Sequence, residues 1–245
     1  MSEAMLWRII SLAVTPQRER LNHVKSLDDA VHHIKQAKNI IILTGAGVSV
    51  SCGIPDFRSR DGVYSRLSRE YPNLPDPQAM FDIKYFFQDP RPFYKFAREI
   101  FPGQFKPSPS HRFIKKLEER GVLLRNYTQN IDTLERIAGI SRLIECHGSF
   151  ATASCTRCKF RINGDAIREH ILQQRIPVCF LCNPHQTAQL EVSVATNTTT
   201  ESPEEQEQLR NLVEKGIFKP DIVFFGEELP DDFHDSIDTD RHKCD

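Results

Sequence analysis

Apolar runs alternate with amphipathic segments through the first 150 residues of the chain. Ser26 precedes apolar residues at helical spacing as far as Ala37, which predicts a capped helix, and residues 39–43 then carry an apolar run typical of a buried strand. The same order returns, with a helix expected over 110–121 and a strand over 122–127. Because helices and strands alternate, the pattern predicts an α/β fold with a Rossmann-like parallel sheet.

More elements of this sheet are expected further along the chain. A short helix should end near Gly139, a strand should follow at 142–146, and the run at 221–225 should add another strand to the alternating pattern. Residues 231–245 are rich in aspartate and hold only isolated apolar positions, so no strand is expected there. No further strand is therefore predicted after residue 225.

Two regions interrupt the alternation. Residues 71–107 are rich in proline and aromatic residues, which indicates a packed helical insertion that lies against the sheet as a lid. Residues 183–210 are polar and suit a solvated loop that runs into a helix ending near Gly216. Before the first strand, apolar residues between Met5 and Ala13 share one helical face, so a helical segment is expected over 1–25.

The sequence argues against two classes of partner, nucleic acid and membranes. Lys and Arg total 32 and Asp and Glu total 33, so no overall positive field would attract nucleic acid. The apolar stretch from Met5 to Val14 is short and is interrupted by Arg8, so neither export nor membrane insertion is expected.

Four of the seven cysteines form two pairs with metal-ligand spacing. Cys155 and Cys158 are separated by two residues, as are Cys179 and Cys182, and twenty residues lie between the pairs. This spacing favours one structural zinc ion held by four thiolates, with no coordination position left for catalysis. Four buried free cysteines are the alternative, which two such pairs make a poor explanation.

These features suggest the following organisation. An N-terminal helical segment over 1–25 precedes the first part of a Rossmann-like domain over 26–150, with the lid insertion at 71–107. A zinc-binding module over 151–216 contains the polar insertion at 183–210, and residues 217–245 return to the Rossmann-like domain.

Glycines directly follow the first predicted strand. Gly45, Ala46 and Gly47 stand where a chain turning into a helix can present backbone N–H groups to a pyrophosphate. The dinucleotide fingerprint is incomplete, because Val50 occupies the position of its third glycine. A strand-to-helix turn that merely needs glycine is the alternative.

Polar and charged groups follow the same strands. Asp56, Phe57 and Arg58 belong to a loop that suits ligand contact, although a solvated surface loop would also explain its charges. Residues 129–132 and His147 come directly after two other predicted strands, at the edge where open α/β sheets bind ligands. An amide, a carboxylate and an imidazole there could hold a carboxamide and move a proton.

These motifs together closely resemble the sirtuins. The resemblance is carried by Gly45–Ser49, Ile54–Arg58, Thr128–Asp132, Cys146–Ser149, Asp221–Glu227 and the four zinc cysteines, and it covers roughly 5–182 and 217–235. It implies NAD-dependent removal of acetyl groups from lysines of histones and other proteins, with release of nicotinamide and formation of O-acetyl-ADP-ribose. The likeness is greatest to a nuclear branch of the family, which implies a role in chromatin and transcription regulation in the nucleus, and also a presence in the cytoplasm.

The resemblance also assigns roles to residues. His147, as general base, and Asn130 would be catalytic. NAD would be bound by Gly45, Ala46, Gly47, Ile54, Asp56, Phe57, Arg58, Tyr64, Gln129, Asn130, Ile131 and Asp132. The acetyl-lysine substrate would be bound by Val223, Phe225, Gly226 and Glu227, and zinc by Cys155, Cys158, Cys179 and Cys182.

The chain departs from the family after residue 230. Sirtuins continue there with a hydrophobic strand and a Gly-Ser-Ser loop, which this sequence lacks. The resemblance therefore implies that the Rossmann-like parallel sheet is incomplete at the C-terminus. We expect the sequence to be an incomplete part of a full enzyme. Two alternatives remain: a short inactive isoform, and a zinc-stabilised protein-binding module that never used NAD, whose interaction surface would be the lid and the acidic tail.

Overall fold

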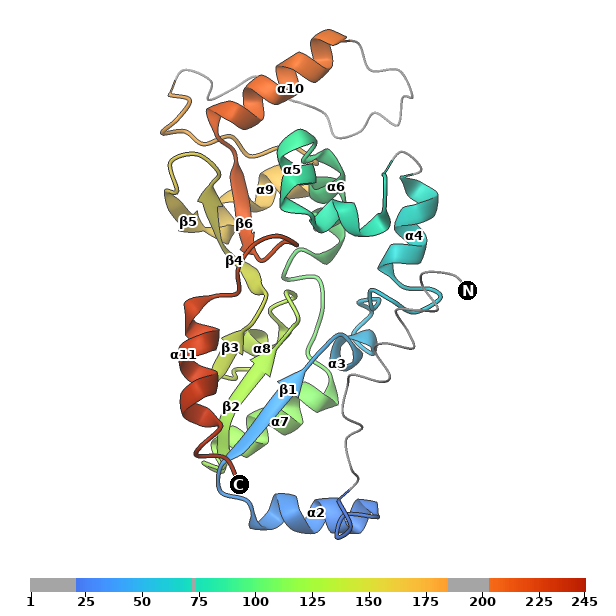
Figure 1. The fold of residues 1–245 in the computed structure, drawn as a ribbon, viewed down its shortest axis with the longest axis vertical. Coiled ribbons are helices and arrows are strands. Elements are labelled where there is room, and N and C mark those ends of the chain that lie inside the picture. Colours follow the sequence, from blue (N-terminus) through green and yellow to red (C-terminus); the bar gives the residue numbers. More distant parts are fainter. Residues whose placement is uncertain (1–20, 72–73, 185–202) are drawn as a thin grey trace, which may run out of the picture. The chain divides into compact units, whose positions relative to one another are not determined.

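The computed structural model describes residues 21–71, 74–184 and 203–245 (Figure 1). The chain divides into two compact units, residues 1–37 and 38–245. The apolar face expected between Met5 and Ala13 lies outside the described residues.

Helix α2 (Leu27–Gln36) belongs to the first unit and begins where the sequence predicted. The Ser26 hydroxyl accepts a hydrogen bond from the backbone N–H of Asp29, and the Asp29 carboxylate accepts one from the backbone N–H of Ser26. This reciprocal capping box satisfies two of the N–H groups that a helix start leaves without partners.

A three-stranded parallel sheet occupies one part of the second unit. Its strands are β1 (Ile40–Thr44), β2 (Leu123–Thr128) and β3 (Leu143–Glu145), in the order β1-β2-β3. The three strands predicted from the first 150 residues are thus confirmed. Their carboxyl ends are aligned, since Thr44 pairs with Thr128 and Thr128 pairs with Glu145.

Short helices connect these strands. α3 (Gly47–Val50) follows β1 directly, α4 (Val63–Glu70) comes later in the same crossover, and α8 (Leu134–Ile137) lies between β2 and β3. α7 (Pro109–Glu119) precedes β2, and its buried Ile114 and Leu117 form a small core with Leu123 and Ile140.

Helix α7 begins slightly earlier than the sequence analysis expected. Its cap is Ser108 rather than Ser110, because Pro109 occupies the first turn, where a missing N–H costs nothing. The His111 side chain accepts a hydrogen bond from the backbone N–H of Ser108 and completes the cap.

A second sheet, of antiparallel strands, corrects the prediction of uniform alternation. It contains β4 (Gly148–Cys155), β5 (Arg161–Asn163) and β6 (Phe218–Ile222) in the order β5-β4-β6. The strand expected at 221–225 therefore ends at Ile222 and pairs with β4 instead of joining the parallel sheet. Strand β4 was missed because Gly148–Cys155 is a mixture of small and polar residues without a long apolar run.

The insertion after α4 is helical and tightly packed, as expected. It contains the 3₁₀ helix η1 (Pro77–Phe81), α5 (Ile83–Gln88) and α6 (Arg91–Ile100). Its packing partner differs from the prediction: the aromatic residues join a large core with the antiparallel sheet and with η2 (Gly164–Ile167) and α9 (Arg168–Leu172), not with the parallel sheet. Edge-to-face pairs such as Phe86 with Phe224, whose ring centroids are 5.3 Å apart, hold this core together.

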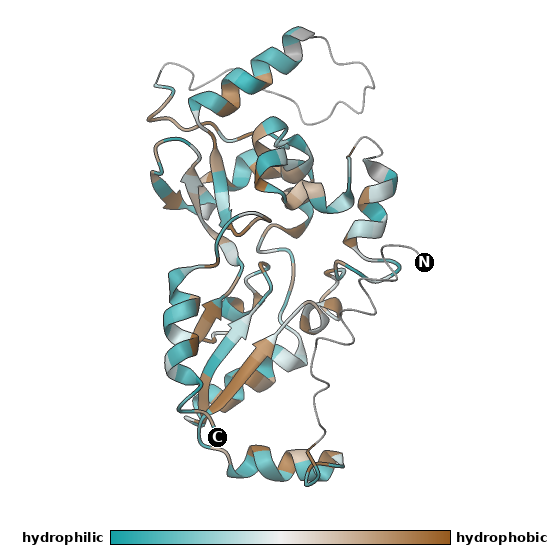
Figure 2. Cartoon of the chain, viewed as in Figure 1, coloured by the Kyte–Doolittle hydropathy of each residue, from teal (hydrophilic) through white to brown (hydrophobic). Residues whose placement is uncertain are grey.

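The last two helices consist largely of hydrophilic residues (Figure 2). α10 (Pro203–Lys215) ends just before Gly216, as predicted, and Gly216 has φ +103°. The acidic segment after residue 230 forms α11 (Asp231–Asp240) and no strand, which agrees with the expectation. One of its aspartates, Asp240, is buried, so this helix is not simply a solvated acidic tail.

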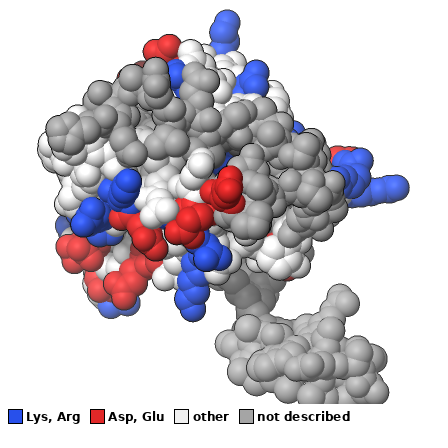
Figure 3. Space-filling model, turned by 90° about the horizontal axis from the view of Figure 1, so that it is seen from above, with Lys and Arg blue, Asp and Glu red and all other residues white. Residues whose placement is uncertain are grey.

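The surface carries charges of both signs. On the face shown in Figure 3, acidic and basic side chains lie next to each other, in agreement with the net charge of −1. Among the helices of the described residues, none combines the length and the hydrophobicity needed to cross a lipid bilayer.

Candidate functional site

A cavity of about 510 Å³ lies at the carboxyl ends of the parallel strands. It brings together loops that are far apart in the sequence. The expected site residues that line it are Ala46, Asp56, Phe57, Arg58, Tyr64, Gln129, Asn130, Ile131, His147, Val223, Phe225, Gly226 and Glu227. Four other expected residues, Gly45, Gly47, Ile54 and Asp132, do not belong to the lining.

The imidazole of His147 is held in one orientation at this cavity. Its Nδ1 lies 2.9 Å from the backbone oxygen of Gln129. A carbonyl oxygen only accepts hydrogen bonds, so Nδ1 carries the proton and Nε2 of the neutral ring is left as a proton acceptor. This arrangement suits a general base.

Gly148 explains how His147 reaches this position. It has φ +65°, and a Cβ built on it would lie 1.9 Å from the backbone oxygen of Asp221. Only glycine allows β4 to start so close to β6. The backbone oxygen of His147 in turn accepts a hydrogen bond from the backbone N–H of Val223, which ties the two strand ends together.

Asn130 is fixed by the glycine turn after β1. Its side-chain amide donates to the backbone oxygen of Gly45 at 3.1 Å and to the hydroxyl of Ser49 at 3.2 Å. The Ser49 hydroxyl donates to the carboxylate of Asp132 at 2.6 Å. Asp132 is 6% exposed, so it supports the cavity from below instead of facing it.

An aromatic group forms one wall of the cavity. The ring of Phe57 lies 5.7 Å from that of Tyr64 and 5.6 Å from that of Phe81, measured between centroids. Burial raises the pKa of the Tyr64 hydroxyl, which therefore stays neutral at physiological pH. Such a wall favours a flat ring or an apolar stem over a charged group.

The turn that carries Phe57 closes on itself. The backbone oxygens of Asp56 and Phe57 accept hydrogen bonds from Val63 and Tyr64 at the start of α4. The Asp56 carboxylate also accepts the backbone N–H of Ser59 at 3.1 Å. These bonds leave Arg58 exposed beside the cavity, where its guanidinium can meet an anionic group.

The segment after β6 forms the opposite wall. The backbone N–H of Phe225 donates to Phe81, and its backbone oxygen accepts from Ile83, so the segment is anchored to the helical insertion. Ile222 and Phe224 are buried, whereas Val223 is half-buried and Phe225 is 48% exposed. The two-residue alternation continues beyond the strand, and Val223 and Phe225 share a side as the sequence predicted.

Lys219 braces this segment from within. Its side chain is 11% exposed, and its ammonium donates to the backbone oxygen of Ile222 at 2.7 Å and to Glu227 at 2.9 Å. It also lies 4.2 Å from the centroid of the Phe224 ring. Burial lowers the pKa of Lys219, while the Glu227 carboxylate beside it favours the charged form.

The Glu227 carboxylate is thus engaged within the protein. Besides the bond from Lys219, it accepts the backbone N–H of Phe224 at 2.8 Å. The sequence marked Glu227 as a substrate contact; the residue lines the cavity, and its carboxylate is hydrogen-bonded within this segment.

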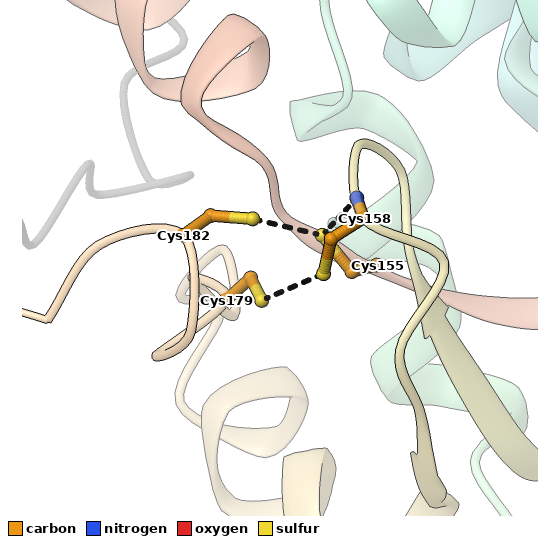
Figure 4. A group of neighbouring side chains, drawn as sticks. All are labelled: Cys155, Cys158, Cys179 and Cys182. Carbon is orange, nitrogen blue, oxygen red and sulfur yellow. Dashed lines mark hydrogen bonds between the residues drawn. The ribbon is translucent and has the colours of Figure 1, made fainter.

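The four predicted zinc ligands meet at one point (Figure 4). Cys155 and Cys158 come from the end of β4 and the knuckle after it, and Cys179 and Cys182 come from a second knuckle. The sulfurs of Cys155 and Cys182 are 3.8 Å apart, as are those of Cys158 and Cys179, and all four lie within 4.8 Å of one another. A tetrahedral zinc site with Zn–S bonds of about 2.3 Å separates its sulfurs by about 3.8 Å.

The surroundings of the sulfurs also suit a cation. The backbone N–H groups of Arg157 and Cys158 donate to the sulfur of Cys155, each at 3.4 Å. The backbone N–H of Phe160, with the neighbouring thiols, lowers the pKa of Cys158 to about 7. Burial raises the pKa of Cys179, a cost that a bound cation would remove.

Four lining residues were missed by the sequence analysis: Phe81, Ile222, Phe224 and Leu229. Phe81 and Phe224 look like ordinary core aromatics in the sequence, and both are indeed buried. Phe81 directly precedes Asp82, whose carboxylate caps α5 by accepting from Lys84 and Tyr85, but a cap predicts a helix start and gives no signal for a cavity.

Comparison with known proteins gives a consistent match. The family model described as "Sir2 family" matches residues 45–245. The NAD-dependent histone deacetylase sirtuin-1 of Drosophila melanogaster is 59% identical, over 99% of this chain and 29% of that protein. The NAD-dependent protein deacetylase sirtuin-1 of Homo sapiens is 49% identical, over 100% of this chain and 30% of that protein.

A third relative extends the comparison. The NAD-dependent protein deacetylase sir-2.1 of Caenorhabditis elegans is 51% identical, over 100% of this chain and 35% of that protein. The chain therefore spans about a third of the length of the curated relatives it matches.

Proposed function

Since this chain belongs to the Sir2 family, we propose that it is part of an NAD-dependent protein-lysine deacetylase of the acyl-transfer type, acting on acetylated histones and other proteins. The observation that carries the proposal is the fixed tautomer of His147, whose Nε2 is available as a base at a cavity that Asn130 also lines.

The cavity suits the nicotinamide and ribose part of NAD. It combines an aromatic wall at Phe57 and Tyr64, the exposed guanidinium of Arg58, and backbone of the turn at Ala46. When bound, NAD supplies ADP-ribose as the acceptor of the acetyl group, and nicotinamide is the leaving group. Asn130, Ile131 and Gln129 would contact the carboxamide end of the cofactor, and Phe57 would keep water from the reacting carbon.

His147 then acts as a proton acceptor. With Nδ1 donating to Gln129, its Nε2 takes a proton from a hydroxyl group placed in the cavity, a step that imidazole performs well near neutral pH. Val223 and Phe225 would hold the neutral acyl-lysine stem between them. The flanking peptide backbone would pair beside Gly226, a mode of binding with little sequence preference.

The zinc cluster has a structural part in this proposal. Closed coordination by four cysteines leaves no position for substrate or water. The cluster clamps β4 to the second knuckle and to Gly216, where a Cβ would lie 3.0 Å from the sulfur of Cys155.

A nuclear site of action is part of the proposal. It is supported by the relatives from Drosophila melanogaster and Candida glabrata, which are named histone deacetylases. Regulation of transcription through chromatin would follow from such a substrate.

The test is direct. The purified chain is mixed with NAD and an acetyl-lysine peptide, and nicotinamide and O-acetyl-ADP-ribose are measured by mass spectrometry. Equal amounts of both products are expected, and His147→Ala should lower their rate by about a hundredfold or more. Peptide binding without product from the wild-type chain would contradict the proposal and favour a binding module.

A further inference from the structure

A buried carboxylate near the cavity belongs to a residue that is not among the expected site residues. Glu135, in α8, is 1% exposed. Its Oε1 accepts hydrogen bonds from two threonine hydroxyls, that of Thr128 at 2.6 Å and that of Thr44 at 3.0 Å. Burial raises the pKa of Glu135, so the position is an expensive one for a carboxylate.

One of the two threonines connects Glu135 to the cavity. The Thr128 hydroxyl, while donating to Glu135, accepts the backbone N–H of Asn130 at 3.1 Å. The Thr44 hydroxyl instead accepts the side-chain amide of Asn126 at 3.2 Å. The two threonines are neighbours in the parallel register and are 1% and 3% exposed, but only Thr128 is linked to Asn130.

The connection fixes the direction of each hydrogen bond. Glu135 can only accept while ionised, so the Thr128 proton points toward it and the Thr128 lone pairs are left for Asn130. The backbone of Asn130 is held in this way, and its side chain is held separately by Gly45 and Ser49. Glu135 is thereby connected to the backbone of Asn130 and not to its side chain.

A strained turn places Glu135 next to the threonines at the ends of β1 and β2. Thr133, directly before α8, has φ +64° and ψ +11°, a left-handed conformation that β-branched residues rarely adopt. The turn directs Asp132 toward Ser49 and Glu135 toward the two threonines. Such strain persists where the surrounding contacts over-determine it.

We infer that Glu135 is a positioning residue, which holds the backbone of Asn130 through the Thr128 hydroxyl so that the Asn130 amide can meet the leaving carboxamide. This inference rests on the proposed function for the identity of the ligand. The positioning itself rests on the contacts alone.

The experiment uses three variants of the chain. Thr128→Val removes the hydroxyl that links Glu135 to Asn130, and Glu135→Leu removes the oxygen that accepts this hydroxyl, with little change in side-chain volume. Thr44→Val is the matched control, because it removes an equivalent hydroxyl from Glu135 but no bond from Asn130. Hydrogen exchange of the Asn130 backbone amide is measured by NMR in all three.

We expect exchange of this amide to become about tenfold or more faster in Thr128→Val and Glu135→Leu, and to stay within about twofold of wild type in Thr44→Val. In the turnover assay, the first two should lower kcat by about tenfold and weaken inhibition by nicotinamide, with the KM for peptide unchanged.

An Asn130 amide as well protected in Thr128→Val and Glu135→Leu as in Thr44→Val would overturn the inference, as would loss of kcat to the same extent in all three. If the wild-type chain makes no product, the proposed function fails, but the exchange rates still decide whether Glu135 positions Asn130.

Discussion

The carboxylate of Asp240 accepts a hydrogen bond of 2.8 Å from the hydroxyl of Tyr127. The same carboxylate pairs with the guanidinium of Arg125 at 2.8 Å, and its side chain is 2% exposed. Helix α11 is thereby fastened to the central strand of the parallel sheet.

Asp240→Ala should therefore destabilise the fold. It leaves a buried hydroxyl and a partly buried guanidinium without their acceptor, so we expect a loss of about 1–3 kcal/mol in the free energy of unfolding. Urea denaturation followed by circular dichroism measures it. Asp238→Ala is the control, since its side chain is 72% exposed and its pair with Arg241 should contribute less than about 1 kcal/mol. Equal losses in the two variants would contradict this reading of α11.

The lowered pKa of Glu118 predicts how the free energy of unfolding depends on pH. Burial raises the pKa of its carboxyl, but hydrogen bonds from Lys115, Ser141 and Arg142 outweigh this and lower the pKa from 4.5 to about 2. The folded-state value lies below the unfolded one, so the contribution is complete above about pH 4.5 and is lost as the pH falls toward 2.

Glu118→Gln should accordingly flatten the decline of stability between pH 4.5 and 2, measured as the urea midpoint at each pH. Its neighbour Glu119 is the matched control, because it is 52% exposed and lies 3.8 Å from Lys116. If Glu119→Gln changed the pH profile as much as Glu118→Gln, the effect would be one of net charge.

Zinc bound by the four cysteines should stabilise the fold. Cys179→Ser is expected to abolish binding of about one zinc ion per chain, measured by a colorimetric release assay. Because zinc ligation contributes directly to folding, the thermal midpoint should fall by about 10 °C or more. Cys244→Ser should change neither, since Cys244 is exposed and lies outside the cluster. Zinc retained in Cys179→Ser would contradict the assignment.

The contact between Lys219 and Glu227 should affect peptide binding selectively. Lys219→Met removes the ammonium that braces the segment carrying Phe225, so we expect the KM for acetyl-lysine peptide to rise about fivefold while the KM for NAD stays within about twofold. Glu228→Gln is the control, because Glu228 is exposed and does not line the cavity. A parallel rise in both KM values would show that Lys219 serves general stability instead.

The sequence by itself determined the features that depend on local spacing. The apolar runs of β1, β2 and β3, the cap at Ser26 and the glycine at the end of α10 all follow from contacts within a few residues. The four cysteines were found in the same way, because a tetrahedral thiolate site imposes its spacing on the sequence. The edge at which His147 and Asn130 meet followed from a general property of parallel sheets.

Only the tertiary structure decided which segments pair across long separations. The order of apolar and polar residues over 218–222 does not tell whether this strand pairs in a parallel or an antiparallel sheet. It pairs with β4 because Gly148 allows the backbone of Asp221 to approach closely. Asp240 and Glu135 resemble ordinary surface acids in the sequence. Their burial depends on partners that other elements bring to them, Arg125 and Tyr127 for Asp240, and Thr44 for Glu135. Periodicity reports only which face of an element is apolar, whereas the partner of a buried charge is known once the chain has folded around it.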